Sequence, residues 1–109
     1  MSVILWGFLS RQIQVDMLSY DVAYSWVCGI EDHDHLIECL WVWHNCDMNV
    51  DPVRKENATN TRDYGGWTPT GVAAHDLISV EPLHIEASIY WPSCCGMHGF
   101  IRDGKYLAV

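Results

Sequence analysis

The last third of the chain alternates apolar and polar residues in the way that β-strands require. From residue 83 to residue 91 every second side chain is apolar, with histidine, glutamate, serine and tyrosine between them. Because successive side chains of a strand point to opposite faces, this pattern predicts a strand with one buried face. Two further apolar runs, 99–101 and 106–109, flank the dipeptide Asp103-Gly104. Asp-Gly between apolar runs is a strong signal for a two-residue β-hairpin.

The rest of the chain also favours strands, because no long stretch keeps a helical period and β-branched and aromatic residues dominate. Residues 36–43 are apolar apart from Glu38, which is typical of a strand buried on both faces. Residues 3–9 fit either a strand or a short helix. The remaining predicted strands are residues 12–15, 20–28, 67–72 and 77–80.

These elements predict a mostly β, small single-domain antiparallel fold. The 109 residues are enough for one domain, 1–109, with one modest core. Residues 47–66 are polar and lack apolar periodicity, so we predict a long, mobile loop there.

Charge excludes some partners. The net charge is −8 with six basic residues, and no basic stripe is present, so we expect no nucleic-acid binding. The acidity favours solubility, a basic protein partner or cation binding, with DNA mimicry as an alternative. The apolar run 3–9 is too short to span a bilayer and no basic region precedes it, so we expect no membrane association and no secretion.

The chain has five cysteines, which we expect to be reduced in a cytosolic protein. Cysteine with histidine in a reduced compartment points to metal binding before disulfides. Cys95 and His98 have the C-x-x-H spacing of half a zinc site, with glycines beside the imidazole. His44 and Cys46 form the best second pair, because they follow the buried run 36–43.

The predicted ligands of one structural Zn²⁺ are therefore His44, Cys46, Cys95 and His98. Cys94 is an alternative to Cys95, because we expect adjacent side chains not to enter one small site together without strain. Cys28 is an alternative to Cys46, whereas Cys39 fits the core.

Two other interpretations involve chemistry. Residues 29–35 alternate acids and histidines, which fits an exposed hairpin loop or a second cation site. Ser88 is the candidate nucleophile of a hydrolase, and it would need His98 or His75 from a neighbouring strand as its base. A catalytic zinc would instead have three protein ligands and an open position, with Glu86 or Asp76 as the base.

Residues 91–105, WPSCCGMHGFIRDGK, resemble the ending of small, uncharacterised phage and prophage proteins, as do residues 76–83 and 87–89. These proteins are distantly similar to a metal-binding family encoded beside bacterial ubiquitin-like conjugation genes. Some members of that family are thought to be peptidases that remove the ubiquitin-like tag. By position, the resemblance implies that Cys95 and His98 form the later ligand pair, His44 and Cys46 the earlier pair, and Ser88 the serine of a Pro-Ser-Ile-like segment. The chain lacks that segment's proline and has no C-P-x-C motif.

The expected function is that of a small phage-encoded zinc-binding accessory protein, which acts by protein–protein interaction with a phage or host partner. We expect it in the host cytoplasm or the virion. The alternative is a zinc-supported hydrolase or peptidase that acts on a protein or a ubiquitin-like substrate.

Overall fold

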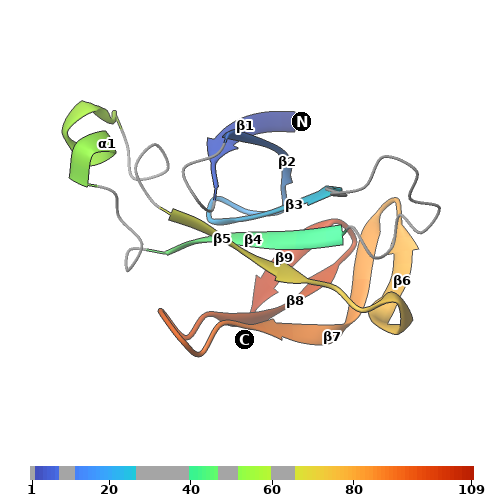
Figure 1. The fold of residues 1–109 in the computed structure, drawn as a ribbon. Coiled ribbons are helices and arrows are strands. Elements are labelled where there is room, and N and C mark those ends of the chain that lie inside the picture. The colour runs from blue at the N-terminus through green and yellow to red at the C-terminus, as the bar shows by residue number, and fades with distance from the viewer. Residues whose placement is uncertain (1, 8–11, 27–39, 47–51, 60–65) are drawn as a thin grey trace.

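The computed structural model describes residues 2–7, 12–26, 40–46, 52–59 and 66–109, and it confirms a mostly β fold of two antiparallel sheets (Figure 1). The strands are β1 Ser2–Trp6, β2 Gln12–Met17, β3 Val22–Trp26, β4 Leu40–Cys46, β5 Gly66–Gly71, β6 Leu77–Val80, β7 Leu83–Tyr90, β8 His98–Arg102 and β9 Lys105–Ala108. A short helix, α1, spans Pro52–Asn57, and one 3₁₀ turn spans Ala74–Asp76.

The first sheet has the strand order β1-β2-β3-β4-β5, so each strand pairs with its neighbour in sequence. A parallel bridge between Gly7 and Trp67 also links the end of β1 to β5. The two edge strands, β1 and β5, therefore approach each other, and the sheet is strongly curved with one concave face. Leu5, Val15 and Trp67 are buried in a core on that side, together with Ala23 and Trp43.

The second sheet has the order β6-β7-β8-β9 and packs beside the first (Figure 1). The predicted Asp-Gly turn joins β8 to β9, and both turn residues have positive φ, 52° at Asp103 and 72° at Gly104. Positive φ at both positions is the geometry of a type I′ turn, which matches the right-handed twist of the strands it connects. The hairpin signal in the sequence is thus confirmed.

A second core lies between the two sheets. Leu40 and Val42 of β4 contribute to it, as do Ile85 of β7 and Ile101 of β8, all of them fully buried. Because side chains alternate along a strand, the same β4 also gives Trp43 to the core of the curled sheet. The prediction that this strand is buried on both faces is confirmed for its described part, Leu40–Cys46.

The structure differs from the predictions in two element boundaries and in the burial of one residue. The buried strand continues past Trp43 to Cys46, so His44 and Cys46 lie within it and not after it. The prediction that residues 47–66 form one long loop is wrong for Pro52–Asn57, which form α1 with proline at the first helical position, where its missing N–H is tolerated. Ala87, expected to be buried, is exposed, because the pairing of β7 with β8 is irregular between Ile85 and Ile89.

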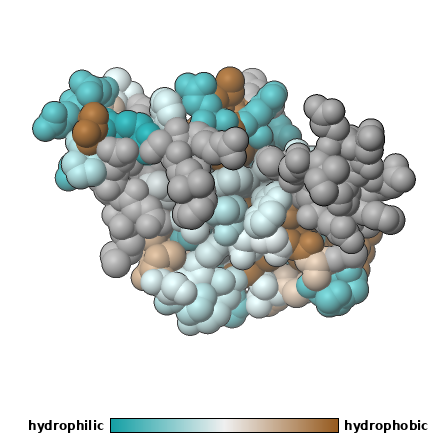
Figure 2. Space-filling model, viewed as in Figure 1, coloured by the Kyte–Doolittle hydropathy of each residue, from teal (hydrophilic) through white to brown (hydrophobic). Residues whose placement is uncertain are grey.

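On the face of the molecule seen in Figure 2, hydrophilic residues cover α1 at the upper left, and apolar residues show only as small, separate patches. No helix in the described ranges is long and apolar enough to cross a membrane.

Candidate metal centre

Strand β4 directs two potential ligands at the second sheet. Side chains of a strand alternate, so His44 and Cys46 share the face of Leu40 and Val42. His44 is fully buried and Cys46 is 1% exposed, as expected for side chains that continue the core between the sheets. The apolar run that forms the core therefore also fixes the direction of these two side chains.

The segment after β7 carries two more potential ligands on a tight turn. The Gly96 N–H donates to the Trp91 carbonyl (2.9 Å), and the Trp91 N–H donates to the Met97 carbonyl (2.9 Å). Gly96 has a φ of +74°, a conformation that residues with a Cβ rarely adopt. Cys94 and Cys95 lie inside this turn, at the end of the second sheet that faces β4.

The four side chains His44, Cys46, Cys94 and Cys95 place one nitrogen and three sulfur atoms within 4.8 Å of one another. His44 Nε2 is 3.2 Å from Cys94 Sγ, and the sulfurs of Cys94 and Cys95 are 3.9 Å apart. In a tetrahedral zinc site with usual bond lengths, the ligand atoms are about 3.6 Å (N to S) and about 3.8 Å (S to S) apart. The group therefore has the size and the composition to hold a metal ion.

The local electrostatics favour a thiolate at Cys94. Burial raises the pKa of this thiol, but hydrogen bonds from the Cys95 and Gly96 backbone and from the Cys46 and Cys95 side chains outweigh burial, and its pKa lies below the usual value. Backbone N–H groups that converge in a turn form a small anion-binding concavity. A thiolate is the form in which cysteine binds metals, so the turn prepares this ligand.

His44 is held as a neutral imidazole. Burial lowers its pKa, and the Thr68 backbone and the Asp21 carboxylate oppose this only in part. Its ring stacks on Trp91 with centroids 4.0 Å apart and an interplanar angle of 25°. Nε2 points toward the thiols, whereas Nδ1 is buried and has no hydrogen-bond partner of good geometry in the part of the chain that the structure describes. The neutral form is the one that coordinates a metal ion.

The structure groups three of the four predicted ligands, His44, Cys46 and Cys95, and adds Cys94. The expectation that the adjacent Cys94 and Cys95 would not enter one small site together is wrong, because this segment is a turn in which their side chains converge. The sequence signal for that turn is Gly96, directly after the two cysteines.

His98 is not part of the group. It begins β8 opposite Tyr90, and its ring lies 5.0 Å from that of Tyr90. The next residue, Gly99, is buried toward the first sheet, so alternation turns His98 to the outer face of the second sheet. The C-x-x-H spacing matches a zinc motif, but the turn supplies its ligands from two adjacent cysteines. Cys28, Cys39 and the acidic segment 29–35 lie outside the described residues.

Ser88 lies on the exposed side of β7. Its neighbour His84 contacts Glu86 instead (Nε2 to Oε2, 3.2 Å), and His75 contacts Asp76 (3.2 Å). Among the described residues, no hydrogen bond joins Ser88 to an imidazole. This arrangement does not prepare the serine for nucleophilic attack.

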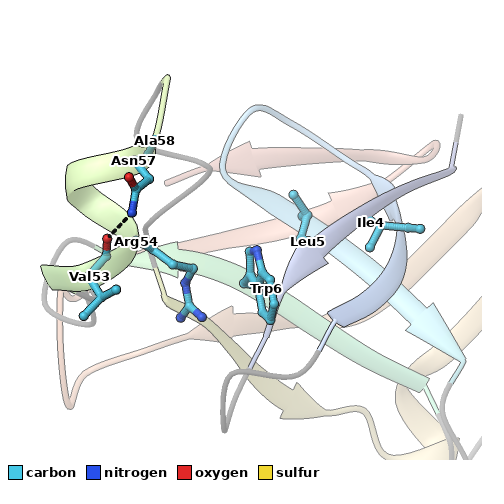
Figure 3. Close-up of a pocket in the computed structure, with 7 residues that line it drawn as sticks. All are labelled: Ile4, Leu5, Trp6, Val53, Arg54, Asn57 and Ala58. Atoms are coloured by element: carbon cyan, nitrogen blue, oxygen red, sulfur yellow. Dashed lines mark hydrogen bonds between the residues drawn. The ribbon is translucent and has the colours of Figure 1, made fainter.

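A pocket of about 310 Å³ lies between β1 and α1 (Figure 3). The Arg54 guanidinium lies 4.8 Å from the centre of the Trp6 ring there, and the Asn57 side chain donates to the Val53 carbonyl (3.1 Å). Among the described residues that line the pocket, none carries a thiol, an imidazole or a carboxylate. It offers packing surface and one cation but none of the groups that the metal centre has.

The fold and the site together define a small, mostly β protein with a cluster of three cysteines and one histidine that could bind a metal ion. No family model, curated protein or solved structure matches the chain.

Proposed function

We propose that the four clustered side chains bind one Zn²⁺ with a structural role. The observation that carries this proposal is the convergence of one imidazole nitrogen and three thiol sulfurs within 4.8 Å. Sulfur-rich tetrahedral sets select zinc, and four protein ligands leave no open position for a substrate or an activated water. The ligands come from β4 and from the turn after β7, so the ion would join the two sheets.

Elemental analysis tests this proposal directly. Protein purified without added metal should contain about one zinc per chain, as expected for a closed four-ligand site. Cobalt substitution should give the strong visible absorption of a tetrahedral, thiolate-rich Co²⁺ site. A stably folded protein that contains no metal and takes up no cobalt would refute a structural zinc.

We further propose that the protein is phage-encoded and works by binding another protein. The resemblance of residues 91–105 to phage proteins supports the origin. The outer face of the second sheet supports the binding role. We use this term for the exposed side that carries Tyr90, His98, Phe100 and Leu107. Tyr90 and Leu107 are 55% and 49% exposed, and Leu107 pairs with Phe100 across the strands.

The outer face is continuous. The rings of His98 and Phe100 are 6.3 Å apart, and the Arg102 guanidinium lies 4.8 Å from the centre of the Phe100 ring. Exposed aromatic residues beside arginine are the composition that protein interfaces favour. Antiparallel sheets usually leave such a face polar when nothing covers it.

Affinity purification from infected host cells can test the binding role with matched variants. Tyr90→Lys combined with Leu107→Lys should abolish capture of a specific partner while zinc content stays at the wild-type level. Val53→Lys, at an equally apolar and 71% exposed position within α1, should not affect capture. Capture that survives the double substitution would place the interface elsewhere, and recovery of nucleic acid alone would contradict the proposal.

A further inference from the structure

The three thiols of the metal centre differ in their access to solvent. Cys46 is buried, Cys94 is partly buried and Cys95 is exposed. All three sulfurs belong to the group whose ligand atoms lie within 4.8 Å of one another. Oxidation of thiolates depends on exposure, so a small oxidant would reach the Cys95 sulfur first.

We propose that Cys95 is a site of reversible oxidation by peroxides, and that its oxidised sulfur forms a disulfide with Cys46 and thereby releases the metal ion. This inference rests on the proposed zinc site. In the first step the Cys95 thiolate attacks one peroxide oxygen, the O–O bond breaks, and hydroxide leaves as Cys95 becomes a sulfenic acid. In the second step the Cys46 thiolate attacks the Cys95 sulfur, the S–O bond breaks, and a second hydroxide leaves.

The two steps are balanced. Two thiolates lose two electrons in forming the S–S bond, and one hydrogen peroxide gains them to become two hydroxides, which the buffer neutralises. The metal loses two of its four ligands, because neither sulfur of a disulfide remains a thiolate. His44 and Cys94 alone cannot form the closed tetrahedral set that holds structural zinc.

Chain geometry selects Cys46 over Cys94 as the second partner. The sulfurs of Cys94 and Cys95 are only 3.9 Å apart, but these residues are adjacent in sequence. Their Cα atoms are then about 3.8 Å apart across a trans peptide bond, whereas disulfides usually require about 4.4 Å or more. Cys46 is free of this constraint because it lies on another strand, β4.

The product keeps the two sheets connected. A Cys46–Cys95 bond joins β4 to the same turn that the metal ion would join, so a covalent link replaces the metal link. We therefore expect the oxidised protein to stay folded, to lack zinc, and to recover its zinc site when a thiol reductant is added with zinc.

The test uses the zinc-loaded full chain and hydrogen peroxide. Zinc release is followed with a chromogenic chelator, and disulfides are mapped by peptide mass spectrometry. Cys95→Asp replaces the exposed thiolate by a carboxylate that can still bind zinc, and His98→Ala, a substitution outside the four-residue group, is its control. Zinc release should slow by at least about tenfold in Cys95→Asp and stay near the wild-type rate in His98→Ala, because only the first variant lacks the exposed thiol.

The results separate this inference from the zinc proposal. Zinc content before oxidation tests the site itself. Mapping of the Cys46–Cys95 bond tests the inference even in chains that hold no zinc. Retention of zinc by the wild-type protein under peroxide would overturn the inference, and so would a disulfide between Cys94 and Cys95 or one that involves Cys28 or Cys39.

Discussion

At the scale of single residues, Cys94 belongs to the group of potential metal ligands, whereas His98, which the C-x-x-H spacing predicted, does not. Cys94 Sγ lies 3.2 Å from His44 Nε2, whereas the His98 ring lies beside Tyr90 on the outer face. Cys94→Ser should therefore weaken zinc binding by at least about 100-fold, since even the loss of a partner that only orients a ligand costs about 10–100-fold. His98→Ala should leave it unchanged. Competition with a chelator of known affinity measures both, and zinc loss from His98→Ala alone would reverse the assignment.

Tyr106 allows a prediction about pH. Burial raises the pKa of its phenol, and the negative charges of Asp21 and Cys95 add to this effect. A group with a raised pKa in the folded state contributes stability that is complete below its unfolded pKa, near 10, and is lost as pH rises through the folded pKa. Its hydroxyl is also buried without a hydrogen-bond partner among the described residues. Tyr106→Phe should thus be neutral or stabilising by up to about 1 kcal/mol at pH 8. It should also reduce the loss of stability above pH 10, as measured by urea unfolding. A larger alkaline loss in the variant would contradict the argument.

At the scale of elements, the hairpin of β8 and β9 depends on Gly99. A Cβ at this position would lie 2.5 Å from the Leu107 carbonyl oxygen and 2.6 Å from the Tyr106 ring. Backbone atoms cannot move aside cheaply, so Gly99→Ala should destabilise the protein by about 1–3 kcal/mol. Gly71→Ala is the matched control, because its Cβ would meet only the Trp41 ring, at 3.5 Å. Thermal unfolding of both variants checks this, and equal effects would refute it.

Elements were also the scale at which the sequence was most informative. Period-two alternation and the Asp103-Gly104 signal are local, and they predicted β7 and the last hairpin closely. The two-sided burial of β4 followed from its continuous apolar run. The ligand set was harder to predict, because it depends on how the chain turns between Trp91 and Met97. A pattern of residue types gives the spacing of His98 but not the face of the sheet from which it projects.

At the scale of the whole molecule, the candidate metal centre lies beside one of the two cores. Trp91, which stacks on His44, belongs to the core between the sheets, whereas Trp43 and Trp67 belong to the core of the curled sheet. Removal of metal by a chelator should therefore lower stability and speed hydrogen exchange first at the end of β4 and in the turn after β7. Amides of β1 and β2 should respond less, because their side chains pack in the other core. Hydrogen-exchange mass spectrometry measures this, and a uniform response would refute it.

Strands β3 and β4 have no solvent side, since Val22 and Val42 face one core while Ala23 and Trp43 face the other. Neither core can unfold without exposing one face of β3 and β4, and the other core needs both of these strands to stay in place. The two cores should consequently unfold in a single cooperative transition. Tolerance to substitution should then be lowest in these two strands, because the side chains on both of their faces are closely packed in a core.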